Sequence, residues 1–204
     1  MWKDEKLTSL LKIAREAGAE ILSIYSRVDD YKVAYKADNS PITEADRRAN
    51  SLITRALSQL SGGLPILSEE SEKIPFCERK AWRDYWLVDP LDGTTNYTHG
   101  YPFFGTSIGL VYKNKPIIGA ISVPYLNELY SACIGVGSFC NDTELEVSTP
   151  SNLSDSLLVT GFSYDRFETE DNNYAEFCYL THKTRGVRRG GAAAVDLAFV
   201  AAGK

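Results

Sequence analysis

Hydrophobic residues recur at helical spacing over the first sixty residues. Between residues 5 and 26 these apolar positions are Leu7, Leu10, Leu11, Ala14, Ala17, Ile21, Leu22 and Tyr25. Side chains spaced by three or four residues share one face of a helix, so we predict an amphipathic helix over residues 5–26. A second pattern of this kind starts after Thr43, the expected N-cap, and ends before Gly62-Gly63.

Shorter apolar runs follow and predict strands. Residues 65–68 and 85–88 are apolar runs that end in Glu69-Glu70 and Asp89, so we predict two buried strands that each deliver carboxylates at the C-terminal end. The charged stretch between them, residues 71–84, contains Pro75 and predicts a loop. Further strands are expected at 106–112, 116–123, 128–134, around 135–141 and at 157–160, and helices at 172–182 and 192–203.

This order of elements, helices first and then a β meander followed by mixed segments, indicates layered α and β packing. The composition, 44% hydrophobic and 24% charged over 204 residues, is that of an ordinary globular protein. The net charge of −5 argues against nucleic acid as a partner. The N-terminus lacks an apolar signal region and no run is long enough to span a membrane, so we expect a cytoplasmic protein without a membrane partner. The four cysteines form no C-x-x-C pair, and we expect them reduced and mostly buried.

Three acidic residues are the candidates for chemistry. Glu69 and Asp89 follow predicted strands, and Asp92 comes three residues after Asp89. Mg²⁺ prefers carboxylate, carbonyl and water oxygens, so this spacing suits a magnesium site. Spacing alone leaves a second interpretation open, because Asp-Gly is a common turn dipeptide and these could be exposed turn acids.

Two neighbouring segments bear on this choice. If a helix begins near Thr94, its free N–H groups favour an anion, and Gly93 lets the backbone approach it closely. A phosphate site directly after two candidate metal ligands strengthens the metal interpretation. Thr43 and Asp46, three residues apart, form either a simple helix cap with a first-turn acid or a part of the same site.

Taken together, these segments resemble the inositol monophosphatase family. The matching stretches are residues 36–46, 67–70, 86–102 and 190–197, and the resemblance runs from about residue 8 to the end of the chain. It implies an α+β fold, a layered α-β-α-β-α sandwich. We expect a single unit over 1–204, with an N-terminal α+β part to about residue 150 and the start of a C-terminal α/β part over about 151–204.

The resemblance also implies roles for individual residues. Side chains of Glu69, Asp89 and Asp92 and the carbonyl of Leu91 would bind two or three Mg²⁺ ions. Asp46, Glu70 and Thr94 would act in catalysis by helping to activate a water molecule. The residues expected to contact the phosphate or the rest of the substrate are Gly93, Thr94, Thr95 and Ala193.

The implied activity is Mg²⁺-dependent hydrolysis of a small phosphate monoester, most readily inositol monophosphate, with lithium sensitivity and a homodimer. Features of the 3′(2′),5′-bisphosphate nucleotidase branch at residues 36–46 and 65–70 keep hydrolysis of adenosine 3′,5′-bisphosphate to AMP open, and histidinol phosphatase activity is a third option. A non-catalytic binding protein with the same fold is the alternative from another class.

One feature of the family is missing from the sequence. The family carries a further metal-ligand Asp in a Trp-Asp motif beyond the helix that ends here near Lys204, together with contacts to the substrate ring. We therefore expect the C-terminal part to be truncated, which leaves open whether the 204-residue chain is itself active.

Overall fold

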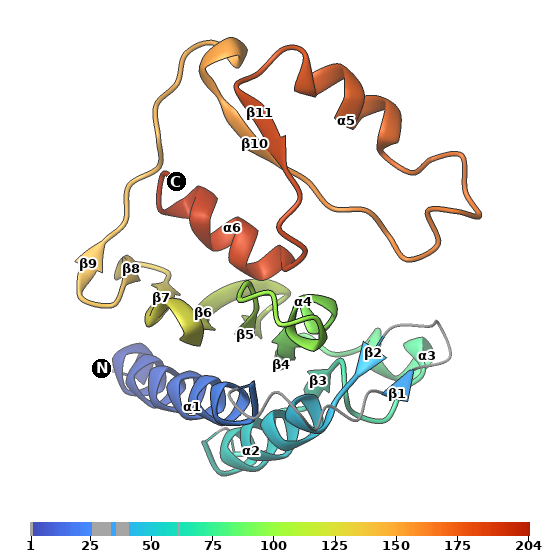
Figure 1. Cartoon of the computed structure of the whole chain (residues 1–204). Coiled ribbons are helices and arrows are strands. Elements are labelled where there is room, and N and C mark those ends of the chain that lie inside the picture. Colours follow the sequence, from blue (N-terminus) through green and yellow to red (C-terminus); the bar gives the residue numbers. More distant parts are fainter. Residues whose placement is uncertain (1, 26–33, 36–40, 61) are drawn as a thin grey trace.

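The structure, a computed structural model, describes residues 2–25, 34–35, 41–60 and 62–204. Helices and sheets alternate in layers (Figure 1). Helices α1 and α2 form the first layer, a seven-stranded sheet the second, α4 and α6 the third, the β10–β11 pair the fourth and α5 the last. The predicted α-β-α-β-α layering and α+β class are confirmed.

The first layer consists of the two predicted amphipathic helices. Helix α1 spans Trp2–Tyr25 and α2 spans Glu44–Leu60. Their apolar faces pack on each other and on the sheet, with Leu10, Ile53 and Leu57 fully buried. The end of the predicted first helix, at residue 26, and the Lys36–Ser40 part of the matching motif lie outside the described residues.

The seven-stranded sheet has its strands in chain order, and only β3 and β4 pair in parallel. Antiparallel pairing through tight turns keeps consecutive strands adjacent. The strands are β3 (Ile66–Ser68), β4 (Tyr85–Asp92), β5 (Gly105–Tyr112), β6 (Lys115–Val123), β7 (Glu128–Cys133), β8 (Gly137–Cys140) and β9 (Thr143–Glu144).

The remaining layers come mostly from the C-terminal part of the chain. Helix α4 spans Thr94–Thr98 and α6 spans Ala193–Ala201, and α6 packs on the sheet face opposite α1. Strands β10 (Leu157–Val159) and β11 (Gly186–Arg188) pair in parallel, and α5 (Tyr174–Thr181) packs beside β11.

Several local expectations are corrected. The predicted loop over 71–84 contains a short helix, α3 (Phe76–Arg79), and β4 continues through Pro90 to Asp92 with an irregular register after Asp89. Only Cys133 among the four cysteines is buried, so the expectation of mostly buried thiols is wrong.

The smaller elements that the sequence did not indicate are β1 (Ala34–Tyr35), β2 (Pro41–Ile42), β9, β11 and two 3₁₀ turns at Pro124–Leu126 and Leu153–Asp155. Among the described residues, no helix combines the length and the apolar character that crossing a membrane requires.

Candidate metal and phosphate site

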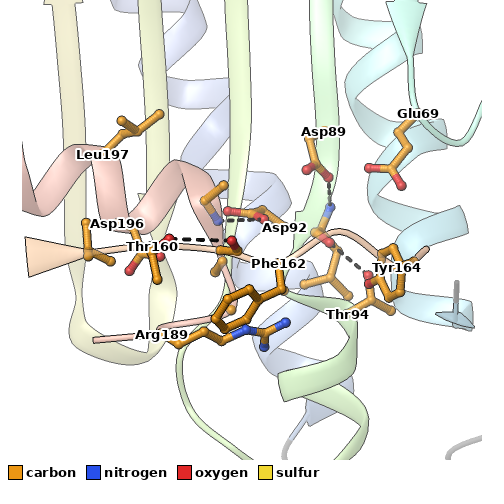
Figure 2. Close-up of a pocket in the computed structure, with 17 residues that line it drawn as sticks. Glu69, Asp89, Asp92, Thr94, Thr160, Phe162, Tyr164, Arg189, Asp196 and Leu197 are labelled. Carbon is orange, nitrogen blue, oxygen red and sulfur yellow. Dashed lines mark hydrogen bonds between the residues drawn. The ribbon is translucent and has the colours of Figure 1, made fainter. Parts of the chain in front are cut away.

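The parallel pairing of β3 and β4 brings two acidic residues to the same edge of the sheet. Ser68 lies opposite Val88 in this register, and the backbone N–H of the next residue, Glu69, donates to the Val88 carbonyl at 3.1 Å. Glu69 and Asp89 therefore follow on neighbouring strands. Figure 2 shows both side chains at one end of a shared cavity.

Asp89 carries the most strongly perturbed carboxyl group of the cavity. Burial raises its pKa to about 8, and the negative charges of Glu69 and Asp92 add to the rise. The N–H of Leu91 donates to Asp89 Oδ1 at 3.1 Å and opposes the rise only in part. The folded protein thus favours the protonated form of Asp89. A cation that replaced this proton would relieve the repulsion among the three carboxylates, which is the condition that favours a bound cation.

Asp92 links this corner to helix α6. Its Oδ1 accepts the N–H of Ala193 at 3.2 Å and its Oδ2 accepts the N–H of Ala194 at 2.6 Å. Burial raises the pKa of Asp92, and these N–H groups at the helix start partly offset that effect. Asp92 therefore joins the sheet edge to the start of α6.

Thr94 and Asp46 form a second group beside the carboxylates. The Thr94 hydroxyl lies 3.1 Å from Asp46 Oδ1 and 3.0 Å from the Leu91 carbonyl oxygen. Asp46 Oδ2 accepts the backbone N–H of Thr43 at 2.7 Å and its hydroxyl at 2.5 Å, while Thr43 Oγ1 accepts the N–H of Ala45 at 3.1 Å. Thr43 is thus the predicted cap of α2, and Asp46 both completes that cap and reaches Thr94.

Gly93 precedes the short helix α4 in a left-handed conformation, with φ of 88°. A Cβ atom at this position would lie 3.0 Å from both the Cβ of Ala192 and the carbonyl oxygen of Phe103. Glycine is therefore required here by backbone conformation and by space. The predicted close approach of the backbone is possible only with this residue.

A cavity of about 460 Å³ collects most of the candidate residues. The sequence-predicted residues that line it are Glu69, Asp89, Leu91, Asp92, Gly93, Thr94 and Ala193. Asp46 lies behind Thr94. Glu70 and Thr95 are outside the lining; the Glu70 backbone contacts Asn50 and Ser68, and the Thr95 hydroxyl lies 3.5 Å from the Tyr164 hydroxyl.

The facing wall was not predicted. It consists of Thr160, Phe162, Tyr164, Arg189 and Asp196, which follow β10 and β11 or lie on α6 (Figure 2). Burial and the charge of Asp92 raise the pKa of Asp196 to about 6, and Arg189 opposes the rise. The residues of this wall come from three separate segments. Asp196 lies within the 190–197 stretch that resembles the family, but that resemblance assigned it no role.

The donor set fits magnesium. It consists of carboxylate and carbonyl oxygens, the ligands that Mg²⁺ prefers, around Asp89, whose ionised form is disfavoured by burial and by two neighbouring carboxylates. Among the described residues, no three acidic, His or Cys side chains converge as a closed ligand cluster. Asp92 retains lone pairs after accepting its two N–H groups, so its bonds to α6 leave it able to serve as a ligand.

Comparisons with known proteins identify the family. Residues 2–204 match the sequence model of the inositol monophosphatase family. The chain belongs to this family. Its fold agrees with the solved structure of inositol monophosphatase from Anabaena (Nostoc) sp. PCC 7120, with a TM-score of 0.84 and 42% identity over 98% of this chain and 72% of that one.

The similar curated relatives carry different names. An inositol-1-monophosphatase of Synechocystis sp. is 44% identical over 97% of this chain and 69% of its own length. The Nus factor SuhB of Pseudomonas aeruginosa is 38% identical over 97% of this chain and 73% of its own length. The 3′(2′),5′-bisphosphate nucleotidase CysQ of Aggregatibacter actinomycetemcomitans is 39% identical over 65% of this chain and 49% of its own length. Membership of this phosphatase family identifies the protein as a phosphoric monoester hydrolase that acts on small phosphorylated substrates, and the names leave the particular substrate open.

Proposed function

We propose that the protein hydrolyses a small phosphate monoester in a Mg²⁺-dependent reaction, with inositol monophosphate, cleaved to inositol and phosphate, as the preferred substrate. The observation that carries the proposal is that Glu69 and Asp89, on neighbouring strands, line the same cavity as the Gly93-Thr94 turn. Acidic side chains repel a phosphate unless a cation lies between them. Their presence beside a turn that admits a phosphate therefore favours metal-assisted phosphoryl transfer.

Glu69, Asp89, Asp92 and the Leu91 carbonyl are the groups that we propose to hold the metal. When bound, Mg²⁺ neutralises charge on the phosphoryl group and lowers the pKa of a water molecule. The protein contributes the arrangement of these oxygens at one edge of the sheet, where Glu69 is exposed and Asp89 and Asp92 are half-buried. The family resemblance suggests two or three ions.

Thr94 and Asp46 are proposed to handle the proton of the attacking water. The Thr94 hydroxyl has one hydrogen and two lone pairs, so it can donate to Asp46 Oδ1 while it accepts from a water in the cavity. Burial raises the pKa of Asp46 above its ordinary value, although hydrogen bonds from Thr43 and Thr94 limit the rise. A carboxylate with a raised pKa is a better proton acceptor than an exposed one. We include Glu70 in this network on the resemblance alone.

Gly93, Thr94, Thr95 and Ala193 are proposed to contact the substrate. The backbone around Gly93, which lines the cavity without a side chain, suits the phosphate. Ala193, at the start of α6, faces the cavity where the alcohol part would lie. Thr95 lies outside the lining, so a contact to the phosphate would come from its backbone or from a shift of its side chain.

The test is phosphate release from inositol 1-phosphate, adenosine 3′,5′-bisphosphate and histidinol phosphate, measured side by side with Mg²⁺ and with EDTA. We expect Mg²⁺-dependent release, fastest from inositol 1-phosphate and inhibited by lithium. Asp89→Asn should abolish it, whereas Asp142→Asn, a change at an exposed turn acid, should not. No release from any ester would refute the proposal, and faster turnover of the bisphosphate would change only the substrate.

A binding role without catalysis is the second candidate, and the similarity to Nus factor SuhB is what favours it. The same assay separates the two. We further propose, from the resemblance, a cytoplasmic homodimer and a division of the unit near residue 150.

A further inference from the structure

Asp196 extends from the first turn of α6 into the cavity that contains the candidate metal ligands. Figure 2 shows it at the opposite end of the lining from Glu69 and Asp89, with Asp92 between them. It is therefore an acidic group on the side of the cavity away from the Glu69–Asp89 corner, where the alcohol part of a substrate would lie.

The neighbours of Asp196 fix its position. The carboxyl group packs over Gly190, where an added Cβ atom would lie 2.3 Å from Asp196 Oδ1. Gly190 is itself held, because its carbonyl accepts the side-chain N–H of Asn96 at 2.9 Å. The backbone N–H of Asp196 donates to the Ala192 carbonyl at 3.0 Å. The helix backbone and the contact with Gly190 thus place the Asp196 carboxylate at the cavity wall, which suits a role in recognition.

The Asp196 carboxylate has unused capacity to accept hydrogen bonds from a ligand. In the part of the chain that the structure describes, no hydrogen bond or close ion pair to this carboxylate is found, and the nearby positive charge is that of Arg189. Arg189 favours the ionised carboxylate, which accepts hydrogen bonds and donates none. A hydroxyl on the alcohol part of a substrate is a donor that fits such an acceptor.

We infer that Asp196 determines substrate specificity by accepting a hydrogen bond from a hydroxyl of the alcohol part of the substrate and by repelling a second phosphate at that position. The inference rests on the proposed function, since it concerns the same cavity. It selects a polyol monophosphate over a nucleoside bisphosphate. Thr160 and Tyr164, on the same wall, offer hydroxyls for further contacts to a polyol.

Two variants separate the two effects. Asp196→Ala removes the acceptor and should raise KM for inositol 1-phosphate about tenfold or more. This is the loss of affinity expected when a hydrogen bond to a charged group is removed. Asp196→Asn keeps a neutral acceptor, so KM for inositol 1-phosphate should rise less, by about threefold, while KM for adenosine 3′,5′-bisphosphate falls. In both variants kcat should stay within about threefold of the wild type, since the hydrogen bond proposed to handle the proton joins Thr94 to Asp46 and does not involve Asp196.

p-Nitrophenyl phosphate is the control substrate, because its alcohol part carries no hydroxyl. Its KM should not change in either variant, and Asp142→Asn should change no KM. An equal rise for p-nitrophenyl phosphate, or a weaker response to Mg²⁺, would show that Asp196 acts on the metal or phosphate and would overturn the inference. So would an unchanged KM for inositol 1-phosphate. Urea unfolding of each variant checks that the fold is retained.

The inference stays testable if the proposed function fails. Should the wild type release no phosphate, no turnover interferes with calorimetry, and the dissociation constants of inositol 1-phosphate and p-nitrophenyl phosphate are then compared directly in the presence of Mg²⁺. Selective weakening of inositol 1-phosphate binding in Asp196→Ala supports the inference. Absence of inositol 1-phosphate binding to the wild type, or equal weakening of both ligands, contradicts it.

Discussion

The first 140 residues and the segment from 141 to 191 differ sharply in burial, although both line the candidate site. Helices α1 and α2 and the seven-stranded sheet enclose a continuous core that includes Leu57, Trp86 and Ile108. Residues 141–191, all of which the structure describes, contain no buried residue. The proposed metal and phosphate groups thus stand on a well-packed sheet edge, whereas most of the facing wall stands on lightly packed segments.

The difference in packing corresponds to two functions of the site, which are stabilisation of the transition state and selection of the alcohol part of the substrate. Groups that stabilise a transition state need fixed positions, which strands anchored in a buried core supply. Groups that select the alcohol part can vary on segments whose sequence is less restricted by packing. Asp92 and Gly93 connect the two regions, because the first binds the start of α6 and the second lies where an added Cβ atom would crowd Ala192.

The largest expected difference in stability is between two leucine-to-alanine variants, one in each region. Leu57 is fully buried in α2, and Leu157 in β10 is 51% exposed. Leu57→Ala should lower the free energy of unfolding by about 2–5 kcal/mol, through lost apolar contact and a residual cavity. Leu157→Ala, the matched control, should lower it by less than about 0.5 kcal/mol. Urea denaturation measures both, and similar losses would refute the contrast in packing.

A second prediction concerns the ionisation of Asp89 at the sheet edge. The pKa of Asp89 is about 8 in the folded protein and about 3.9 when unfolded, so between these values the folded state binds the extra proton. The contribution of this group to the free energy of unfolding therefore falls as pH rises from about 4 to about 8.

Asp89→Asn removes this loss. Without metal, the variant should be more stable than the wild type at pH 8 by roughly 2–5 kcal/mol and about equally stable near pH 4. Urea unfolding in EDTA at both pH values measures the difference. If Asp89→Asn is no more stable than the wild type at pH 8, the raised pKa of Asp89 is contradicted. Asp142→Asn, a change at an exposed residue, is the control.

The smallest effect tests the junction of the two regions. Gly93 and Gly62 both have positive φ, of 88° and 60°, but a Cβ at Gly62 would meet nothing within 4 Å. Both alanine variants incur the left-handed strain, of about 1 kcal/mol. Gly93→Ala should lose about 1 kcal/mol more, because its Cβ would crowd Ala192 and Phe103. Equal losses in thermal or urea unfolding would show that the junction accommodates a methyl group.

The spacing of apolar residues predicted the elements that are long enough to show a helical or strand period. The first two helices and the strands from β5 to β7 lie within a few residues of the expected positions, because each has one face on the core. The short helix α3 escaped prediction because four residues are too few to show a helical period. Strand β11 escaped because it is three residues long and its partner β10 lies about thirty residues earlier.

The candidate site divides in the same way. Glu69, Asp89, Asp92 and Gly93 could be predicted because strand ends and a turn bring them together over a short stretch of chain. The opposite wall depends on long-range packing. Asp196 lies on α6, whose first residue binds Asp92 about one hundred residues earlier in the chain, and Arg189 follows β11. No local pattern encodes that contact.

Titration of Mg²⁺ into the metal-free protein by calorimetry tests the central claim most directly, because it requires no substrate and no turnover. We predict saturable binding to the wild type and to Asp142→Asn, and binding at least about tenfold weaker to Asp89→Asn, since a carboxylate ligand of a hard cation is lost. Equal binding by all three proteins, or no binding by the wild type, would contradict a magnesium site at Glu69, Asp89 and Asp92.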